Sequence, residues 1–227
     1  MRYCLLLLLL LQASLPAAAD TRVVFDEQSP QLLRAVGKLS VPGHRFIDGE
    51  KQAHQQDCSA SLIGPRTILT AWHCLEYYRD YSYELVFTMP NVPGQPPVIA
   101  HRLDTGKGMD ADWALLRLLR PIRGVTPIPV DSGTAPAPSS SLLLAGFAAD
   151  AGLGANGDKL TWQDGCQLDR LGARDWGTNC VTYTGASGGP VLSTGRIIGV
   201  ISAGDREAHT YFTPSDRFIS AVRLYLR

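Results

Sequence analysis

Three side chains of the sequence, His73, Asp112 and Ser187, are of the types that together make a serine nucleophile reactive. A serine hydroxyl attacks poorly until a neighbouring imidazole accepts its proton. The imidazole in turn needs a carboxylate that fixes its tautomer and stabilises its charge. We therefore expect these three residues to form a catalytic triad, provided that the fold brings them together.

The serine lies in a glycine-rich segment, Gly185-Ala-Ser-Gly-Gly189. Glycine lets the backbone bend tightly, and the backbone N–H groups of Gly185 and Ser187 could both point at a developing oxyanion. A plain turn or an anion-binding loop is the alternative. The segment also matches the G-x-S-x-G elbow of α/β-hydrolases, but that fold needs an acid and then a histidine after the serine. Only His209 follows Ser187, so we exclude the α/β-hydrolase fold.

Asp112 and His73 could each have a purely structural role instead of a catalytic one. Asp112 enters an apolar run, where an unpaired charge is costly and an imidazole N–H would offset the cost. Asp110 we interpret as a turn residue instead. A single histidine usually has no catalytic task, but His73 follows a predicted strand and precedes Cys74, which could hold its backbone in place.

The first 19 residues resemble a cleavable export signal. Met1-Arg2 is a short positive start, Leu5–Leu11 is apolar, and Ala17–Ala19 offers the small residues that a signal peptidase reads. The apolar run is too short to span a bilayer, which makes an uncleaved anchor the weaker alternative. The mature chain would begin at Asp20 and be secreted or periplasmic, with no membrane span after cleavage.

Four cysteines remain after that cleavage, and an even number in an oxidising compartment predicts two disulfides. Three pairings are possible, and proximity in the sequence favours Cys58–Cys74 and Cys166–Cys180. No C-x-x-C pair is present, so a structural zinc site is disfavoured. We expect no metal and no cofactor.

The composition is that of a globular β protein without an electrostatic partner. Lys and Arg together number 21, as do Asp and Glu, which leaves too little positive charge to hold nucleic acid or an anionic membrane. The 227 residues include 22 Gly and 15 Pro, which favours many turns between short strands.

Short strands are predicted in two sets separated by the Pro- and Ser-rich linker 131–141, which suggests two similar halves. Trp72–Tyr78 could form one or two helical turns, and residues 214–227 are predicted to form a helix that Thr213 caps and Pro214 opens. The expected strands are Ala35–Val41, Cys58–Ile63, Ile68–Ala71, Tyr83–Thr88, Val98–Leu103, Trp113–Leu118, Leu142–Phe147, Cys166–Leu168, Pro190–Ser193, Ile197–Ala203 and Tyr211–Thr213.

From about Ala35 onward the sequence resembles a secreted trypsin-like serine peptidase of the chymotrypsin fold, of a bacterial branch. The resemblance rests on Cys58-Ser-Ala-Ser-Leu-Ile-Gly-Pro-Arg-Thr-Ile-Leu-Thr-Ala-Trp-His-Cys74, Asp112-Trp-Ala-Leu-Leu116, Gly185-Ala-Ser-Gly-Gly-Pro-Val191 and Gly199-Val-Ile-Ser-Ala-Gly204. The three triad segments occur in the order of that family.

The resemblance implies an all-β fold of two packed antiparallel six-stranded β-barrels with a C-terminal α-helix. The barrels would span residues 35–130 and 142–213, after an N-terminal segment 20–34, and residues 35–227 would form one peptidase domain. The active site would lie between the barrels.

The resemblance also assigns roles to residues. His73 would be the general base and then acid, Asp112 its orienting partner and Ser187 the nucleophile, with Gly185 and Ser187 at the oxyanion hole. The resemblance also places Ser202 beside the aspartate and Gly204 where its backbone pairs with the substrate backbone. Val181 and Thr182 would lie in the substrate pocket.

The implied activity is that of a monomeric serine endopeptidase that forms an acyl-enzyme on protein or peptide substrates. An inactive pseudo-peptidase that acts as a binding module is one alternative, and an esterase with the same triad is another. The segment Val181-Thr182-Tyr183 lacks the acid needed for cleavage after Arg or Lys, and Asp205 is interpreted as a solvated turn residue. Ile201 stands where glutamyl endopeptidases have a histidine, so we expect a neutral or apolar residue before the scissile bond.

Two positions depart from the family pattern. Ala186 replaces the aspartate that pairs with a newly freed N-terminal ammonium, so we expect no activation by cleavage and an ordinary strand at Arg34–Gly37. Trp72 replaces a small alanine beside the histidine, and we expect its indole to pack without displacing His73.

Overall fold

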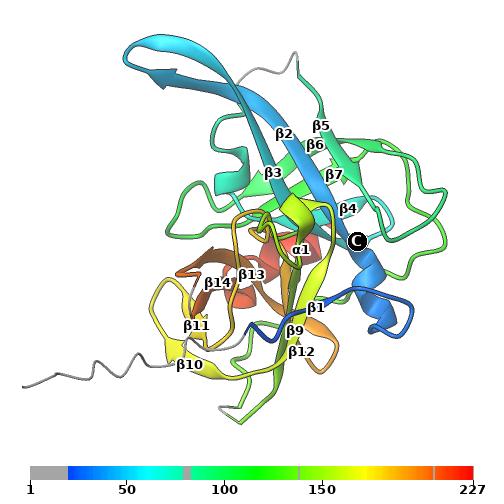
Figure 1. Ribbon diagram of the computed structural model, residues 1–227, viewed down its shortest axis with the longest axis vertical. Coiled ribbons are helices and arrows are strands. Elements are labelled where there is room, and N and C mark those ends of the chain that lie inside the picture. The colour runs from blue at the N-terminus through cyan, green and yellow to red at the C-terminus, as the bar shows by residue number, and fades with distance from the viewer. Residues whose placement is uncertain (1–19, 79–82, 138, 207, 227) are drawn as a thin grey trace, which may run out of the picture.

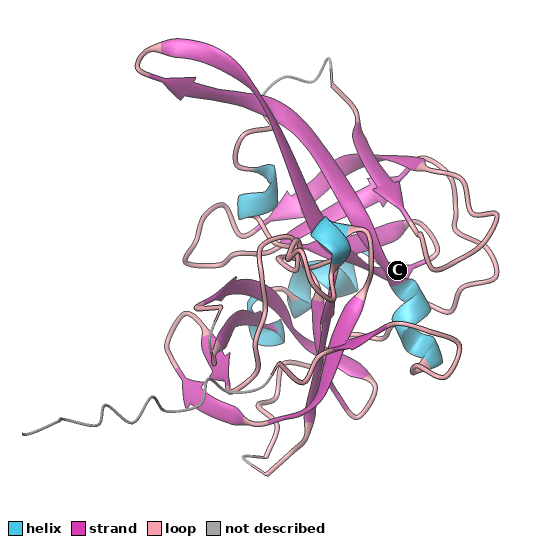
Figure 2. Cartoon of the chain, viewed as in Figure 1, coloured by secondary structure: helices cyan, strands magenta, loops and turns pink. Residues whose placement is uncertain are grey.

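The computed structural model describes residues 20–78, 83–137, 139–206 and 208–226, and the predicted signal peptide lies outside them. Strands make up most of the described chain (Figure 2). They form two sheets that pack together, the first almost entirely from the first half of the sequence and the second mainly from the second half (Figure 1). The predicted all-β fold with a C-terminal helix is confirmed.

The first sheet closes into a six-stranded barrel in which every neighbouring pair is antiparallel. Its interior is apolar, and side chains such as Leu39, Leu69 and Leu115 are fully buried there. The strands, in barrel order, are β2 (Val36–Ile47), β3 (Glu50–Gly64), β4 (Thr67–Thr70), β7 (Ala114–Leu118), β6 (Val98–Thr105) and β5 (Leu85–Thr88).

The second sheet has eight strands and stays open, where the sequence analysis expected a second closed six-stranded barrel. The N-terminal segment adds a strand, β1, to its edge, where Val23 and Val24 pair with Trp162 and Thr161. The order is β1 (Val23–Val24), β9 (Thr161–Cys166), β8 (Leu142–Gly146), β12 (Pro190–Ser193), β13 (Arg196–Gly204), β14 (Thr210–Pro214), β11 (Trp176–Thr178) and β10 (Leu168–Leu171).

The helical elements are short, and the predicted C-terminal helix begins later than expected. Thr213 and Pro214 continue strand β14, because the backbone of Pro214 is extended, with φ −73° and ψ 156°. The buried side chains Phe218 and Val222 pack the end of the chain onto the core, as predicted. The elements are the 3-10 turns η1 (Gln31–Ala35), η2 (His73–Leu75), η3 (Ala155–Gly157) and η4 (Ser215–Arg217) and the helix α1 (Ile219–Tyr225).

Strands β2 and β3 extend past the barrel as a long two-stranded arm (Figure 1). Their pairing runs without a break from Val36–Ser61 to Ile47–Glu50, and the tip exposes Phe46, whose relative accessibility is 71%. The expected strands stop at 41 and resume at 58, because residues 42–57 lack apolar alternation. The pairing continues through them nevertheless.

Both predicted disulfides are present, Cys58–Cys74 and Cys166–Cys180, with sequence separations of 16 and 14. We expect the double substitution Cys166→Ser and Cys180→Ser to lower the free energy of unfolding by about 3 kcal/mol, because it frees a loop of this length in the unfolded chain. Urea denaturation followed by tryptophan fluorescence would measure it, and an unchanged midpoint would contradict it.

In the described part of the chain, no helix combines the length and the apolar character that crossing a membrane requires.

Candidate active site

His73 and Asp112 meet because they flank neighbouring antiparallel strands. Thr70, the last residue of β4, pairs with Ala114, the first residue of β7. His73 therefore follows one strand where Asp112 precedes the other. The carboxylate binds the histidine twice: His73 Nδ1 lies 2.7 Å from Asp112 Oδ2, and the His73 backbone N–H donates to Oδ1 at 2.8 Å. Both the position and the tautomer of the imidazole are thereby fixed.

Asp112 is fully buried, and residues from both halves of the molecule form hydrogen bonds with it. The Ser202 hydroxyl donates to Asp112 Oδ2 at 2.5 Å, and the Thr213 hydroxyl donates to the Asp112 carbonyl oxygen at 3.2 Å. Because a buried carboxylate is costly without partners, the Ser202 bond and the two contacts to His73 offset its burial. Ser202 lies where it was predicted. Thr213 was predicted to cap a helix and instead anchors the aspartate backbone.

Ser187 lies in a sharp turn on one wall of a cleft of about 570 Å³ that His73 also lines. Gly185 has φ +91° and Gly188 has φ +83°, a backbone conformation that residues with a side chain rarely adopt. Among the described residues, no acceptor binds the N–H of Gly185 or of Ser187. Two unpaired donors from residues that line one cleft are what an oxyanion requires.

Ser187 and His73 share the cleft, yet within the described chain the Ser187 hydroxyl forms no hydrogen bond to the imidazole. Such contacts are often long in enzymes without substrate and shorten when substrate binds. The structure thus brings the three predicted residues to one site, with the histidine–aspartate contact already formed.

The sequence model of the trypsin family matches residues 35–222, which cover most of both sheets. The chain belongs to the trypsin family. No curated protein matches the sequence. Among solved structures, a scabies mite inactivated protease paralogue, S-I1, superposes with a TM-score of 0.66 at 16% sequence identity, over 86% of this chain and 95% of that one. At this identity the likeness shows a common fold.

The trypsin-family match leaves out the N-terminal segment that forms β1. The predicted bacterial origin stays a prediction.

Ser59 joins the two halves of this trypsin-family fold at the nucleophile. Its N–H donates to the Ser187 carbonyl, and its fully buried hydroxyl donates to the Gly185 carbonyl while accepting the Phe147 N–H, each at 2.8 Å. Sequence reasoning did not select this residue. A polar side chain next to Cys58, at the start of a buried stretch of strand, was the available signal.

We expect Ser59→Ala to lower the free energy of unfolding by about 1–3 kcal/mol, because it leaves a buried N–H and a buried carbonyl without their partner. It should also slow hydrolysis by loosening the Gly185 backbone. Thermal unfolding and kcat measure the two effects. Ser40→Ala, which removes two hydrogen bonds at an exposed site, is the control. Equal values for both variants would contradict the role given to Ser59.

The predicted substrate-binding residues divide into two groups. Thr182 and Gly204 line the cleft, whereas Val181 is buried and its N–H donates to Gln163 Oε1, so its role in substrate binding stays a prediction. The Asp205 carboxylate accepts the N–H groups of Ala208 and His209 and so closes its own turn.

Three further side chains border the site. Arg206 lines the cleft and donates to the Thr184 hydroxyl at 3.1 Å. His54, from the arm, lines it too, and burial together with the nearby Arg45 charge lowers its pKa. Trp72 is half-buried just before η2 and leaves the contact between His73 and Asp112 intact, as expected.

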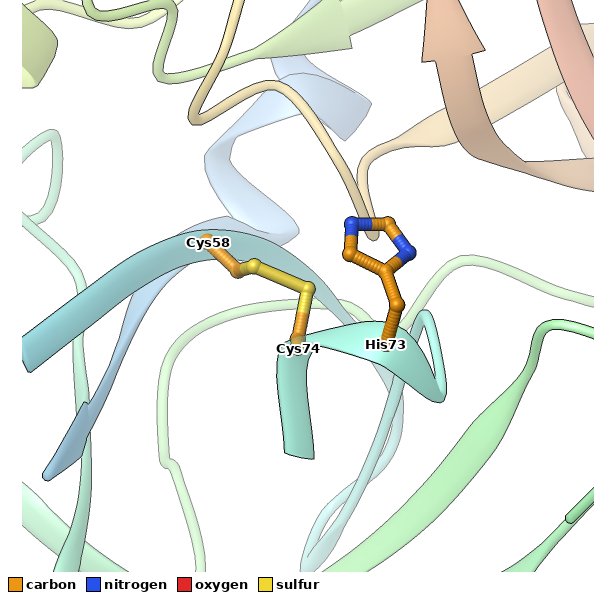
Figure 3. A group of neighbouring side chains, drawn as sticks. All are labelled: Cys58, His73 and Cys74. Carbon is orange, nitrogen blue, oxygen red and sulfur yellow. A yellow bond between two sulfur atoms is a disulfide. The ribbon is translucent and has the colours of Figure 1, made fainter. Parts of the chain in front are cut away.

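Cys58, His73 and Cys74 lie together, with ligand atoms within 4.8 Å of one another. Figure 3 shows the sulfur atoms joined in a disulfide beside the imidazole. Metals bind cysteine as thiolate, so these bonded sulfurs are poor ligands. The disulfide instead fastens the turn that carries His73 to strand β3.

Proposed function

We propose that this trypsin-family protein is a secreted serine endopeptidase. The observation that carries the proposal is the contact of 2.7 Å between His73 and the buried Asp112 in the cleft that also holds Ser187. The two unpaired N–H groups of Gly185 and Ser187 support it. Positioned groups of these types are sufficient for acyl transfer without a cofactor.

In the proposed reaction, the Ser187 hydroxyl attacks the substrate carbonyl carbon while His73 Nε2 takes its proton. The carbonyl oxygen becomes an oxyanion held by the N–H groups of Gly185 and Ser187. His73 then gives the proton to the leaving amine, the C–N bond breaks, and an acyl-enzyme on Ser187 remains. A water molecule then attacks the acyl-enzyme while His73 takes its proton. The ester bond breaks, His73 returns the proton to Ser187, and the carboxylic acid product is released. Asp112 stays ionised and stabilises the imidazolium.

We propose that the pocket before the scissile bond takes a small neutral or apolar side chain. Thr182, Ile201 and Ala203 line this part of the cleft and carry no charge. Two of the lining residues approach closely, because a Cβ on Gly204 would lie 2.6 Å from the Thr182 hydroxyl oxygen. A digest of a peptide library, read by mass spectrometry, tests this preference directly.

Export fits the two disulfides, which form and persist in oxidising compartments. We place the export signal at residues 1–19 and the peptidase domain at residues 35–227, acting as a monomer on protein or peptide substrates. N-terminal sequencing of secreted protein tests the cleavage site, which should leave Asp20 first.

A fluorophosphonate probe tests the activity, because it bonds only to an activated serine. Wild-type protein should be labelled and Ser187→Ala should not. Oxidised, folded wild-type protein that takes up no probe would favour a binding module, the reading that the absent hydrogen bond between Ser187 and His73 supports. Hydrolysis of esters but not of matched amides would favour an esterase.

A further inference from the structure

The N-terminal segment inserts a buried arginine into the second half of the molecule. The Arg22 side chain is 3% exposed, and its guanidinium donates to Asp20 at 2.6 Å and to Asp150 at 2.8 Å. The same group lies over the Tyr183 ring, 4.2 Å from the centroid. Two carboxylates and one aromatic face thus surround one cation.

The charges of this cluster depend on one another. Burial alone would lower the pKa of Arg22, but hydrogen bonds from its guanidinium to Asp20 and Asp150 outweigh it and the pKa is raised. The hydrogen bond from Arg22 lowers the pKa of Asp20. At Asp150 burial raises the pKa, but the hydrogen bond from Arg22 and the other favourable contacts outweigh burial, so this pKa is lowered as well. Both carboxylates therefore stay ionised to a lower pH than an ordinary aspartate, and their stabilisation is lost only as the pH falls through the lowered pKa values.

Two partners of Arg22, Asp150 and Tyr183, belong to segments that border the cleft. Asp150 follows β8 in the loop whose Ala149 N–H donates to the Thr184 carbonyl at 2.6 Å. Tyr183 is itself part of the cleft wall, two residues before Gly185. The guanidinium therefore ties together the two segments that meet at the oxyanion donors.

The residue before Arg22 forms a second link to the same wall. The Gln163 amide donates to the Thr21 hydroxyl at 2.6 Å, and its carbonyl oxygen accepts the Val181 N–H at 3.1 Å. Pairing of β1 with β9 places Thr21 and Arg22 at this point. Two consecutive residues of the N-terminal segment thus hold the wall 181–183.

The residue before the nucleophile cannot supply such a tie. Ala186 is 3% exposed and has no charged group. It is also tightly packed, because a Cβ added to Gly146 would lie 2.8 Å from the Cβ of Ala186. Arg22 also lies outside residues 35–222, which match the trypsin family. The tie thus comes from a segment that the family model does not cover.

We propose that Arg22 is a positioning residue that holds the segment 181–187 in the conformation needed to bind an oxyanion. This inference rests on the proposed peptidase function for its effect on rate. Without Arg22, Asp150 and Tyr183 lose their common partner, and the Gly185 and Ser187 N–H groups lose their fixed direction. Misplacement of such donors slows the chemical step more than it weakens substrate binding.

The kinetic test compares Arg22→Gln with Arg174→Gln, which removes an exposed arginine from an ion pair with Asp110. We expect Arg22→Gln to lower kcat roughly 10- to 100-fold with little change in KM, and Arg174→Gln to match wild type. In Arg22→Ala, millimolar guanidinium should restore part of kcat, whereas urea, of the same shape but uncharged, should not. A kcat for Arg22→Gln within two-fold of wild type would overturn the proposal.

Amide hydrogen exchange separates this proposal from the peptidase function. The hydrogen-bonded amides of the segment 181–187, those of Val181 and Ala186, should exchange at least about ten-fold faster in Arg22→Gln than in wild type, with Arg174→Gln unchanged. Exchange is measured whether or not the wild type takes up a fluorophosphonate, so an inactive wild type defeats only the peptidase function. If Arg22→Gln does not fold, Asp150→Asn, which leaves the Asp20 contact, replaces it. Unchanged exchange in the folded variant would overturn the positioning role.

Discussion

Replacing Ser187 by alanine should lower kcat by about 10⁶, the scale known for loss of a serine nucleophile. The variant keeps the backbone N–H groups at positions 185 and 187 and the contact between His73 and Asp112, so substrate should bind with nearly unchanged affinity. Only the atom that forms the acyl-enzyme is missing. Steady-state hydrolysis of a peptide that wild type cleaves measures kcat, and calorimetry with the same peptide measures binding.

The matched control for this change is Ser202→Ala, which removes a hydroxyl bonded to Asp112 and leaves the nucleophile. We expect a far smaller decrease in kcat there, because the carboxylate keeps both contacts to His73. Should Ser187→Ala retain a tenth of the wild-type rate, Ser187 would not be the nucleophile and the proposed mechanism would fail.

Replacing Asp112 by asparagine should lower kcat by about 10⁴, as the equivalent change does in another member of the trypsin family. Asp112 accepts hydrogen bonds at both oxygens, from the ring and from the backbone of His73. An amide keeps the shape but can donate where the carboxylate accepts, so the imidazole would take the wrong tautomer. It would also lack the charge that stabilises the imidazolium.

Asp110→Asn is the control for Asp112→Asn, since Asp110 lies two residues away with its side chain 80% exposed. Its rate should equal that of wild type. Circular dichroism and thermal unfolding show whether each variant is folded. If a folded Asp112→Asn variant hydrolyses peptides at the wild-type rate, the buried carboxylate has no catalytic role.

Much of the site could be predicted because its chemistry is local in the sequence. His73, Asp112 and Ser187 each lie in a short segment with a distinctive composition, and the cysteines are close enough in sequence for proximity to favour the correct pairs. The closed barrel follows from apolar strands such as β4 and β7, which are readily recognised.

What sequence reasoning missed depends on contacts between distant segments. The two-residue strand β1 exists because β9 offers it a partner, and nothing in Val23-Val24 alone indicates it. Arg22 and Ser59 acquire their roles only when the N-terminal segment and β3 reach the second half. The arm is missed for a related reason, since its strands stabilise each other with polar residues.

The Cys58–Cys74 bond has a consequence for where the protein can act. The turn that carries His73, the proposed general base, is fastened to β3 by a link that forms only when thiols are oxidised. In the reducing interior of the producing cell we expect His73 to lie on a loose turn, so newly made molecules would spare the proteins around them. The redox state of the surroundings would then restrain the proposed hydrolysis until the disulfide forms.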